Sequence, residues 1–181
     1  MIPSTRDIAF QLRQGQLIAL ADETGWSVAA DPVNDVAVEQ LLTLLPVMPA
    51  GLRPTVLIQN PDQLVLYIAK LPDVAYDLVE FAENPLTVIY DQGKNLSPVA
   101  ERYLETQATG GLSVRRTLSA DVQRLIGGFG RGLLTIPFES VQLPSAAAAL
   151  VVMRFGTLPA MPKRPRIMRL GANGEVSFVR K

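Results

Sequence analysis

A short polar cluster follows the first apolar run of the sequence. Asp22, Glu23 and Thr24 come directly after residues 16–21, and the single tryptophan, Trp26, lies two residues further on. Polar residues just beyond the carboxyl end of a strand lie where open α/β sheets bind ligands. The cluster therefore predicts either a ligand-binding edge or a turn with capping residues. Trp26 could stack on a flat ligand, although an isolated tryptophan is more typical of a core.

Two apolar runs and one glycine-rich segment of the sequence contain or adjoin arginines. Arg53 precedes the apolar run 54–59, and Arg115 and Arg116 close the run 111–116. Successive side chains of a strand point to opposite faces, so at most one of these two arginines faces a given pocket. An arginine in a cleft suits phosphate or carboxylate, and the alternative is a surface ion pair. The segment GGFGRG (127–132) lacks a phosphate-loop pattern and predicts a helix end and turn.

The composition limits the chemistry that any site could perform. The chain has 181 residues, with 48% hydrophobic and 19% charged residues, which predicts one ordinary globular domain over residues 1–181. It contains no cysteine and no histidine. These absences exclude disulfides, thiolate chemistry and the commonest general base. Catalysis would have to use carboxylates, Lys, Arg, hydroxyls and backbone amides, and we expect no metal and no resident cofactor.

Charge is distributed unevenly along a chain that is neutral as a whole. Residues 151–181 carry seven basic residues and one acidic residue, a net charge of +6, which leaves −6 for residues 1–150. This segment could bind phosphates or an acidic partner, or it could fold back on the acidic body. The sequence shows no signal-peptide pattern and no apolar run of membrane-spanning length, so we expect a cytoplasmic protein that does not bind membranes.

Short apolar runs alternate with helical patterns, which predicts an α/β domain with a twisted mixed sheet and flanking helices. Residues 165–180 form two alternating runs around Gly171–Gly174, which indicates a terminal hairpin. A proline-containing stretch before it, 158–166, reads as an extended connection. The other strands are predicted at 16–21, 54–59, 86–91, 111–116 and 132–138, and the helices at 4–15, 34–45, 62–69, 73–83, 97–103, 119–129 and 144–155.

Taken in order over residues 4–180, five segments resemble motifs of the YrdC/YciO family, whose active members are threonylcarbamoyl-adenylate synthases. The resemblance implies a YrdC-like fold and a concave face that binds nucleotide or RNA phosphate. In the active members, threonine, bicarbonate and ATP with Mg yield the intermediate for a tRNA modification, threonylcarbamoyladenosine. The matching segments are LADETGWSVAADP (20–32), LLTLLPVMPAGLRPTVLIQN (41–60), ENPLTVIY (83–90), LSVRRT (112–117) and LLTIPFESVQ (133–142).

The chain departs from the family motifs at positions that contact charge. The family's Lys-x-Arg pair falls near Leu45 and Val47, and neither side chain can bind phosphate. The family's STSAN element falls on Thr135, Pro137 and Glu139, where Glu139 puts a negative charge close to the phosphate position. The motif histidine is replaced by Ser119. Losing one hydrogen bond to a charged group costs about 1.5–3 kcal/mol, so several losses together could abolish catalysis.

The resemblance leaves a small set of candidate substrate- or nucleotide-binding residues and no assignable catalytic residue. Thr24 and Thr87 would bind the amino-acid or carbamate end, Arg53 and Arg115 would bind carboxylate or phosphate, and Glu23 stands in register with the family's first motif. We expect these groups to converge on one cleft, with Thr24, Thr87 and Arg115 partly exposed. An Arg115 paired to Glu23 or Glu139 would instead indicate a structural cleft.

The resemblance favours a divergent member in which synthase activity is weak or lost, a pseudoenzyme. An active synthase is the alternative. Two other functions stay open. The basic segment could bind tRNA or another, double-stranded RNA, or apolar patches such as LLTLLPVM (41–48) could form a homodimer or subunit interface.

Overall fold

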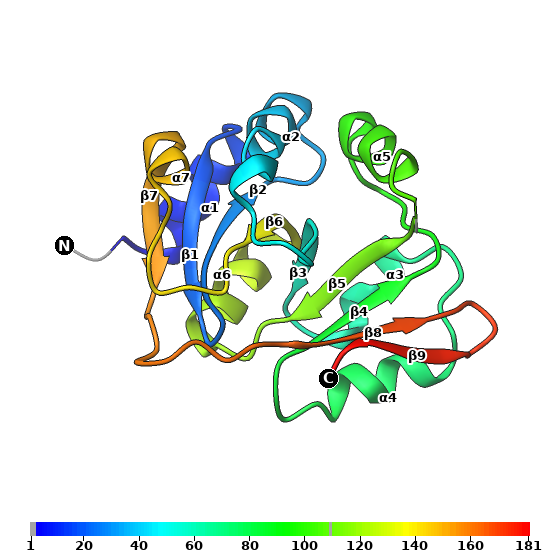
Figure 1. The fold of residues 1–181 in the computed structure, drawn as a ribbon. Helices are drawn as coiled ribbons and strands as arrows, with labels where there is room; N and C mark the ends of the chain where they lie inside the picture. Colours follow the sequence, from blue (N-terminus) through cyan, green and yellow to red (C-terminus); the bar gives the residue numbers. More distant parts are fainter. Residues whose placement is uncertain (1–2, 109) are drawn as a thin grey trace.

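In the computed structural model, which describes residues 3–108 and 110–181, nine strands form one mixed sheet (Figure 1). The pairs β1–β7, β3–β5 and β4–β8 are parallel, and the remaining pairs are antiparallel. In their order across the sheet, the strands are β7 (Val151–Gly156), β1 (Leu17–Asp22), β2 (Gly25–Ala30), β6 (Leu133–Pro137), β3 (Thr55–Ile58), β5 (Leu112–Arg116), β4 (Leu86–Tyr90), β8 (Arg166–Leu170) and β9 (Val176–Arg180).

The predicted strands are confirmed, together with the α/β class and the mixed sheet. All five predicted strands lie within two residues of their expected bounds, as β1, β3, β4, β5 and β6. The predicted terminal hairpin is the antiparallel pair β8–β9, closed by a turn at Gly171–Gly174. Residues 1, 2 and 109 of the predicted 1–181 domain lie outside the described residues.

Two strands differ from the sequence-based prediction. The segment 144–155 is helical only over α7 (Ser145–Leu150), and its second half is β7, parallel to β1. The β-branched Val151 and Val152 favour a strand, and the open edge of β1 supplies a pairing partner that helix propensity does not foresee. Residues 25–30 form β2, which makes a tight hairpin with β1 across Asp22–Gly25. A glycine directly after a polar turn was the available signal for this hairpin.

The helices begin at the side-chain caps that the sequence predicts. Ser4, Asn34, Ser97 and Ser119 each accept a hydrogen bond from a backbone N–H in the first turn of the helix that follows. Gly130 ends α6 (Ala120–Phe129) in the left-handed conformation, which confirms the predicted helix end in GGFGRG. Besides α6 and α7, the described α-helices are α1 (Thr5–Arg13), α2 (Asp35–Leu42), α3 (Leu64–Tyr67), α4 (Val74–Glu80) and α5 (Pro98–Glu105). Two short 3-10 helices are η1 (Leu45–Val47) and η2 (Pro61–Gln63).

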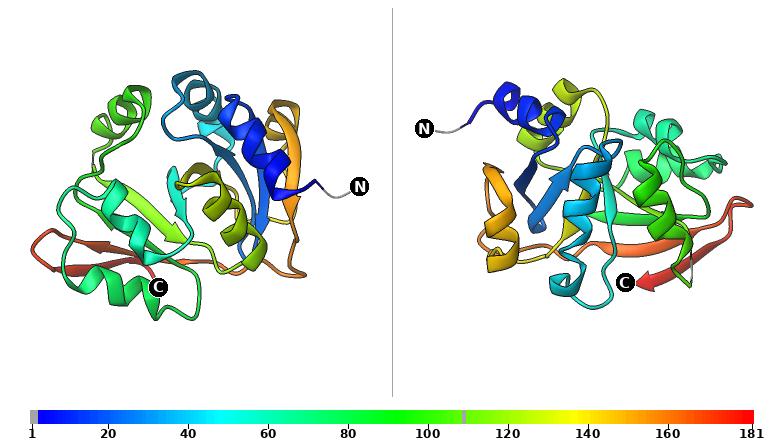
Figure 2. Two further views of the ribbon diagram at one scale, coloured as in Figure 1. Left: turned by 180° about the vertical axis from the view of Figure 1, so that it is seen from behind. Right: turned by 90° about the horizontal axis from the view of Figure 1, so that it is seen from above.

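Two apolar clusters cover opposite faces of the sheet. On one face, α1 and α6 lie side by side and pack on β1, β2 and β3 through residues such as Leu12, Ile126 and Leu57 (Figure 2). On the other face, a larger cluster joins the sheet to α2, α3, α4 and α5. The first cluster does not extend over β5, β4 and β8. On the face of the sheet that α1 and α6 cover elsewhere, the strands β5, β4 and β8 therefore carry no helix. The candidate site lies on this part of the sheet.

The basic segment 151–181 folds back on the body of the protein. Arg180 contacts Glu139 at 2.7 Å, and the guanidinium of Arg154 lies 5.4 Å from the Trp26 ring centroid. Trp26 is buried and its Nε1 donates to the Val141 carbonyl, so its core interpretation is confirmed. Other basic residues of this segment stay exposed, among them Lys163 and Arg166.

In the part of the chain that the structure describes, no helix combines the length and the apolar character needed to cross a membrane.

The β1–β2 turn yields a test of the fold with a matched control. Gly25 has a φ of 95°, and an added Cβ would lie 2.5 Å from the Ser140 carbonyl oxygen. We expect Gly25→Ala to lower the free energy of unfolding by about 1–3 kcal/mol. Gly128 lies in α6 with open space around the Cβ position, so Gly128→Ala should raise it by about 0.4–1 kcal/mol. Urea denaturation measures both, and equal effects would contradict the prediction.

Candidate functional site

Strand register gathers hydroxyl side chains on the sheet face that lacks helices. Thr55 of β3 lies opposite both Ser113 of β5 and Thr135 of β6. Thr87 of β4 lies opposite Arg115 of β5. These positions alternate with core residues such as Val56 and Val114, because successive side chains of a strand point to opposite faces. The result is a polar floor inside an otherwise apolar sheet.

The floor closes a cavity of about 20 Å³. This is far below the roughly 300 Å³ of a small ligand pocket, and a single water needs about 10–15 Å³. The side chain of Ser113 is fully buried in its wall, and its hydroxyl has no hydrogen-bond partner among the described residues. The lining residues are Thr24, Leu52, Arg53, Thr55, Thr87, Ser113, Arg115, Thr135, Pro137, Glu139, Pro165 and Ile167.

Four of the five candidate residues from the sequence line this cavity, and Glu23 does not. The expected partial exposure of Thr24, Thr87 and Arg115 is wrong, because they are only 3%, 7% and 6% exposed. The reason lies in the extended connection between β7 and β8. Its residue Pro165 lines the cavity, as does Ile167 of β8, which lies opposite Thr87 in the sheet. The segment is fixed there by hydrogen bonds from Lys163 N–H to the Glu23 carbonyl and from Arg166 N–H to the Pro85 carbonyl.

The dominant charge of the site, Arg115, is enclosed by acidic and hydroxyl groups. Its Nη2 lies 2.7 Å from Asp22 Oδ2, and its Nη1 lies 3.4 Å from Glu23 Oε2. Nη2 also donates to the Thr24 hydroxyl. Asp22 in turn accepts hydrogen bonds from the Thr24 amide and hydroxyl and from the Thr117 hydroxyl. The guanidinium charge is therefore neutralised within the protein, the outcome that indicates a structural cleft.

The pKa values of the three charged groups reflect this enclosure. Burial opposes the charge of Asp22, but the attraction of Arg115 and the hydrogen bonds from Thr24 outweigh it, and the pKa of Asp22 is lowered. Burial raises the pKa of Glu23; Arg115 opposes this rise and the neighbouring Asp22 adds to it. Burial works against the charge of Arg115 as well, but the two carboxylates raise its pKa above the ordinary value. The arginine stays protonated.

Glu23 ties the β1–β2 turn to the segment that follows β5. Its carboxylate accepts hydrogen bonds from the Leu118 amide at 3.0 Å and from the Thr117 hydroxyl at 3.3 Å. This polar contact continues directly into the cap of α6, where Ser119 accepts from the Val122 amide. In this position Glu23 orients Arg115 and the chain after β5, while its side chain lies away from the cavity wall.

A second acidic residue, Glu139, holds the C-terminal segment against the cavity. It has a φ of 53°, in the left-handed region that residues other than glycine rarely adopt. Its carboxylate lies 2.7 Å from Arg180 and 3.8 Å from Arg164. Glu139 lines the cavity, so the negative charge expected from the sequence does stand in the wall.

Arg53 is the second arginine in the cavity wall, and it has no carboxylate within 4 Å among the described residues. Its Nη2 donates to the Gly110 carbonyl at 2.8 Å. Half-burial and the neighbouring charge of Arg169 lower its pKa. Arg53 is the candidate with the freest charge.

Of the remaining positions that match family motifs, some line the cavity and others lie away from it. Leu45 and Val47 form the short turn η1 and do not line the cavity, whereas Thr135, Pro137 and Glu139 do. Sequence reasoning missed Ser113, Thr55, Thr117 and Arg180 as site residues. It placed Asp22 in a cluster that could be a ligand-binding edge or a turn, and did not include it among the candidate binding residues. The available signal was a polar side chain at every second position, as in Ser113, Arg115 and Thr117. The described residues include no cluster of side chains that could hold a metal ion.

The family model for Sua5, YciO and YrdC proteins, which bears the description "Telomere recombination", matches residues 11–147. This span is more than half of the chain, so the protein belongs to the Sua5/YciO/YrdC family, which confirms the resemblance seen in the sequence. Comparison with curated proteins found no match.

Solved structures share the fold at low sequence identity. YciO from E. coli is 18% identical with a TM-score of 0.73, over 99% of this chain and 90% of that one. A double variant of Sua5 from P. abyssi is 18% identical with a TM-score of 0.72, over 92% and 53%. The same Sua5 complexed with L-threonine is 19% identical with a TM-score of 0.71, over 92% and 50%. The chain thus spans about half the length of these Sua5 chains.

The enclosed arginine leads to a prediction about stability. Asp22→Asn leaves the buried Arg115 charge poorly compensated and should lower the free energy of unfolding by about 3–5 kcal/mol at pH 7. The double variant Asp22→Asn, Arg115→Met should recover part of that loss. Because the folded-state pKa of Asp22 lies below its ordinary 3.8, its contribution is present above pH 3.8 and lost as the pH falls through the lowered pKa.

Urea denaturation between pH 7 and pH 2 measures this prediction. The control is Asp121→Asn, which removes an exposed ion pair with Arg124 and should change stability by no more than about 0.5 kcal/mol. A wild-type protein and an Asp22→Asn variant of equal stability at pH 7 would show that the network does not support the fold.

Proposed function

We propose that this protein is a divergent member of the Sua5/YciO/YrdC family in which the synthase reaction is weak or lost. The observation that carries the proposal is the pairing of Arg115 with Asp22 and Glu23, at 2.7 and 3.4 Å. A cation can stabilise a phosphate or carboxylate only with donors that are free to reach it. To bind such a ligand, Arg115 would have to leave two carboxylates in a buried site.

Size and charge of the cavity support the same proposal. A volume of about 20 Å³ cannot admit an amino acid, still less a nucleotide. Glu139 repels phosphate from the wall and pairs with Arg180, which would otherwise attract it. Of the two arginines among the described residues that line the cavity, Arg53 is the one without a carboxylate partner, so its N–H groups remain available to an anion. Without histidine or cysteine, positioning and charge stabilisation are the main catalytic means left to the site, and the charge is already balanced.

The test is the synthase reaction itself. Purified protein with threonine, bicarbonate, ATP and Mg should release pyrophosphate at least about 10²-fold more slowly than a family member that retains the Lys-x-Arg and STSAN motifs. Sua5 from P. abyssi, solved with L-threonine, is a suitable positive control. A ligand at 100 times its Kd would add about 2.7 kcal/mol to stability and raise the melting temperature. Because we expect neither ATP nor threonine to bind, neither should raise it. Turnover comparable to the control would overturn the proposal.

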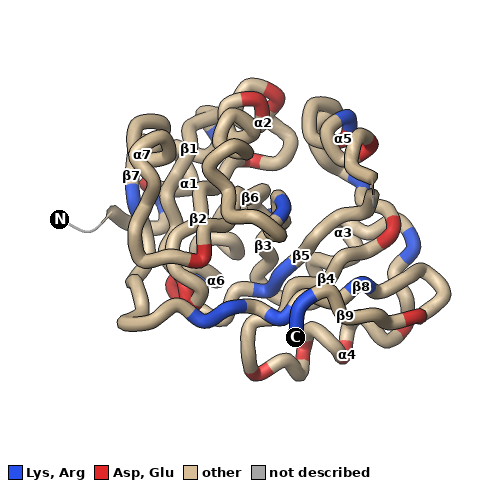
Figure 3. The backbone as a smooth tube through the Cα atoms, in the orientation of Figure 1, with Lys and Arg blue, Asp and Glu red and all other residues tan. Residues whose placement is uncertain are grey.

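Exposed basic residues favour RNA binding as a second candidate function. Lys163, Arg164 and Arg166 are exposed on the segment that leads into β8 (Figure 3). Arg164 is only loosely held, at 3.8 Å from Glu139. A row of exposed cations suits a phosphate backbone, whether of tRNA or of another double-stranded RNA. The absence of a net positive charge limits the expected affinity.

Fluorescence anisotropy with labelled tRNA in a salt series tests this candidate. Replacing Lys163 and Arg166 by alanine should weaken binding and reduce the slope of log K against log salt by about 1.5–2. Replacing the exposed Lys70 and Lys94 by alanine makes the same change in net charge elsewhere and should leave the slope unchanged. No binding by the wild-type protein at low salt would exclude this function.

A further inference from the structure

The strand β9 ends the sheet and leaves an open edge. It pairs with β8 on one side, and no strand of the described residues pairs with its other side. Its side chains are unusually apolar for such a position: Val176 is 48% exposed, Phe178 50% and Val179 58%. Native proteins normally protect edge strands with charges, prolines or covering segments, because free N–H and C=O groups invite a further strand.

The direction of the free backbone groups follows from the hairpin turn. Gly171 N–H donates to the Glu175 carbonyl at 2.8 Å, so these two residues form a hydrogen-bonded pair. Hydrogen-bonded and non-hydrogen-bonded pairs alternate along antiparallel strands. Val176 opposite Leu170 and Phe178 opposite Met168 are therefore non-hydrogen-bonded pairs. Their N–H and C=O groups point away from β8, toward the open edge.

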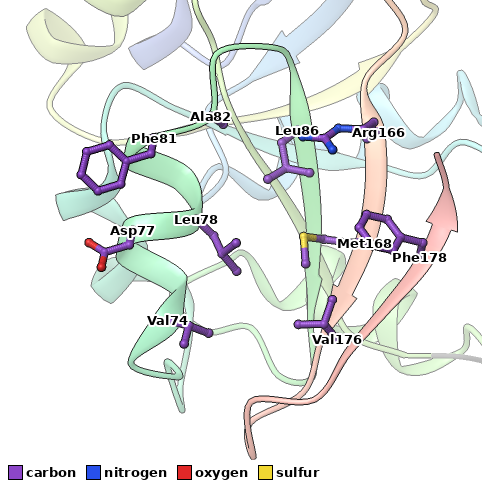
Figure 4. A pocket seen from close by; sticks show the side chains of 10 residues that line it. All are labelled: Val74, Asp77, Leu78, Phe81, Ala82, Leu86, Arg166, Met168, Val176 and Phe178. Carbon is purple, nitrogen blue, oxygen red and sulfur yellow. The ribbon is translucent and has the colours of Figure 1, made fainter.

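An apolar groove of about 540 Å³ runs beside this edge (Figure 4). Val176, Phe178 and Met168 form its sheet side, and Leu78 of the facing helix α4 and Phe81, which directly follows that helix, form the other side. Phe81 is 74% exposed, more than other large hydrophobic residues near it. The apolar surface and the unpaired backbone groups are thus contiguous.

We propose that β9 pairs antiparallel with β9 of a second copy of this chain, about a two-fold axis through Ser177. This register pairs Val176 of each copy with Phe178 of the other and uses the outward N–H and C=O groups of both residues. Each pair combines a β-branched and an aromatic side chain on the groove side of the sheet, a favourable cross-strand combination. The two grooves then form one continuous apolar surface.

Charge complementarity selects a second copy and the antiparallel direction. The exposed Glu175 directly precedes the strand and the exposed Lys181 directly follows it, whereas Arg180 is paired with Glu139. An antiparallel pair sets the acidic start of each strand against the basic end of the other, whereas a parallel pair would set Glu175 against Glu175. A register shift opposite Ile167 and Met168 ends the regular edge after Phe178, so the paired stretch is short. We expect a weak dimer, with a Kd of about 10 µM to 1 mM.

Sedimentation velocity over a concentration series tests the pairing. The wild-type protein should pass from monomer to dimer, and Val176→Pro should raise the dimer Kd at least about tenfold. Proline is tolerated on an edge strand where its N–H would point outward, so this substitution leaves the bonds to β8 in place. Phe10→Ser removes an equally exposed aromatic side chain on α1 and should leave the dimer Kd unchanged. Circular dichroism checks that each variant is folded.

Two further variants keep the proposal falsifiable if Val176→Pro does not fold. Phe178→Lys should prevent dimer formation by placing like charges at the interface. Glu175→Lys should weaken the dimer at low salt, and Glu175→Lys with Lys181→Glu should restore it. A wild-type protein that stays monomeric at about 1 mM overturns the proposal. A dimer that survives both Phe178→Lys and a folded Val176→Pro overturns it as well, as do open-ended oligomers, because a two-fold pair closes.

The synthase reaction and this dimer are independent. The groove and the cavity lie on opposite faces of β8, lined by Met168 and Ile167 respectively. A failed dimer therefore leaves the proposed function intact, and an active synthase leaves the dimer intact.

Discussion

The contact between Arg115 and Asp22 constrains the whole sheet. Arg115 lies near the end of β5 and Asp22 ends β1, and β2, β6 and β3 lie between these strands. Four strand spacings correspond to about 19 Å in a flat sheet. The two side chains nevertheless meet at 2.7 Å, so the sheet must curl strongly at this end. The twist of the strands already favours a curved sheet. The buried ion pair and the hydrogen bonds that Glu23 accepts from Thr117 and Leu118 hold the sheet in its curled form.

The same contact decides what the concave face can do. A curled sheet brings Thr24, Thr87 and Arg115 to one cavity, as a binding site would require. The curl itself is held by Arg115, the arginine to which the family resemblance assigned a carboxylate or phosphate. Any anion that binds Arg115 competes with Asp22, and breaking a buried pair costs about 3–5 kcal/mol when a charge is left uncompensated. Glu139 repeats this arrangement with Arg180 at the other side of the cavity. Asp22 and Glu139 thus neutralise Arg115 and Arg180 within the protein.

The sequence predicted the parts of this structure that depend on local patterns. Apolar runs such as 54–59 and 86–91 are strands because they are buried on both faces, and Ser119 and Asn34 cap helices through local hydrogen bonds. The strand β7 could not be predicted in the same way, because β1, 130 residues away, makes Val151–Gly156 extended. The convergence of Thr24, Thr87 and Arg115 was predicted from family motifs, whereas their burial was not. Pro165 and Ile167 line the same cavity, and their place there depends on contacts between segments distant in sequence. The pairing of Asp22 with Arg115 is likewise a contact between distant segments, so the sequence left a ligand-binding edge and a turn equally open for Asp22.

The ion pairs of the cavity also determine how firmly the far edge of the sheet is held. Arg180 ends β9, and its guanidinium donates to Glu139 and to the Pro165 carbonyl. The connection that precedes β8 is held by the bond from Lys163 N–H to the Glu23 carbonyl. An edge hairpin with apolar exposed side chains would otherwise be free to fray. These bonds hold the β8–β9 hairpin just before it begins, at Lys163, and where it ends, at Arg180, and a strand that is already ordered loses less conformational entropy when it pairs. The carboxylates that close the cleft therefore also prepare the edge of the sheet for a partner.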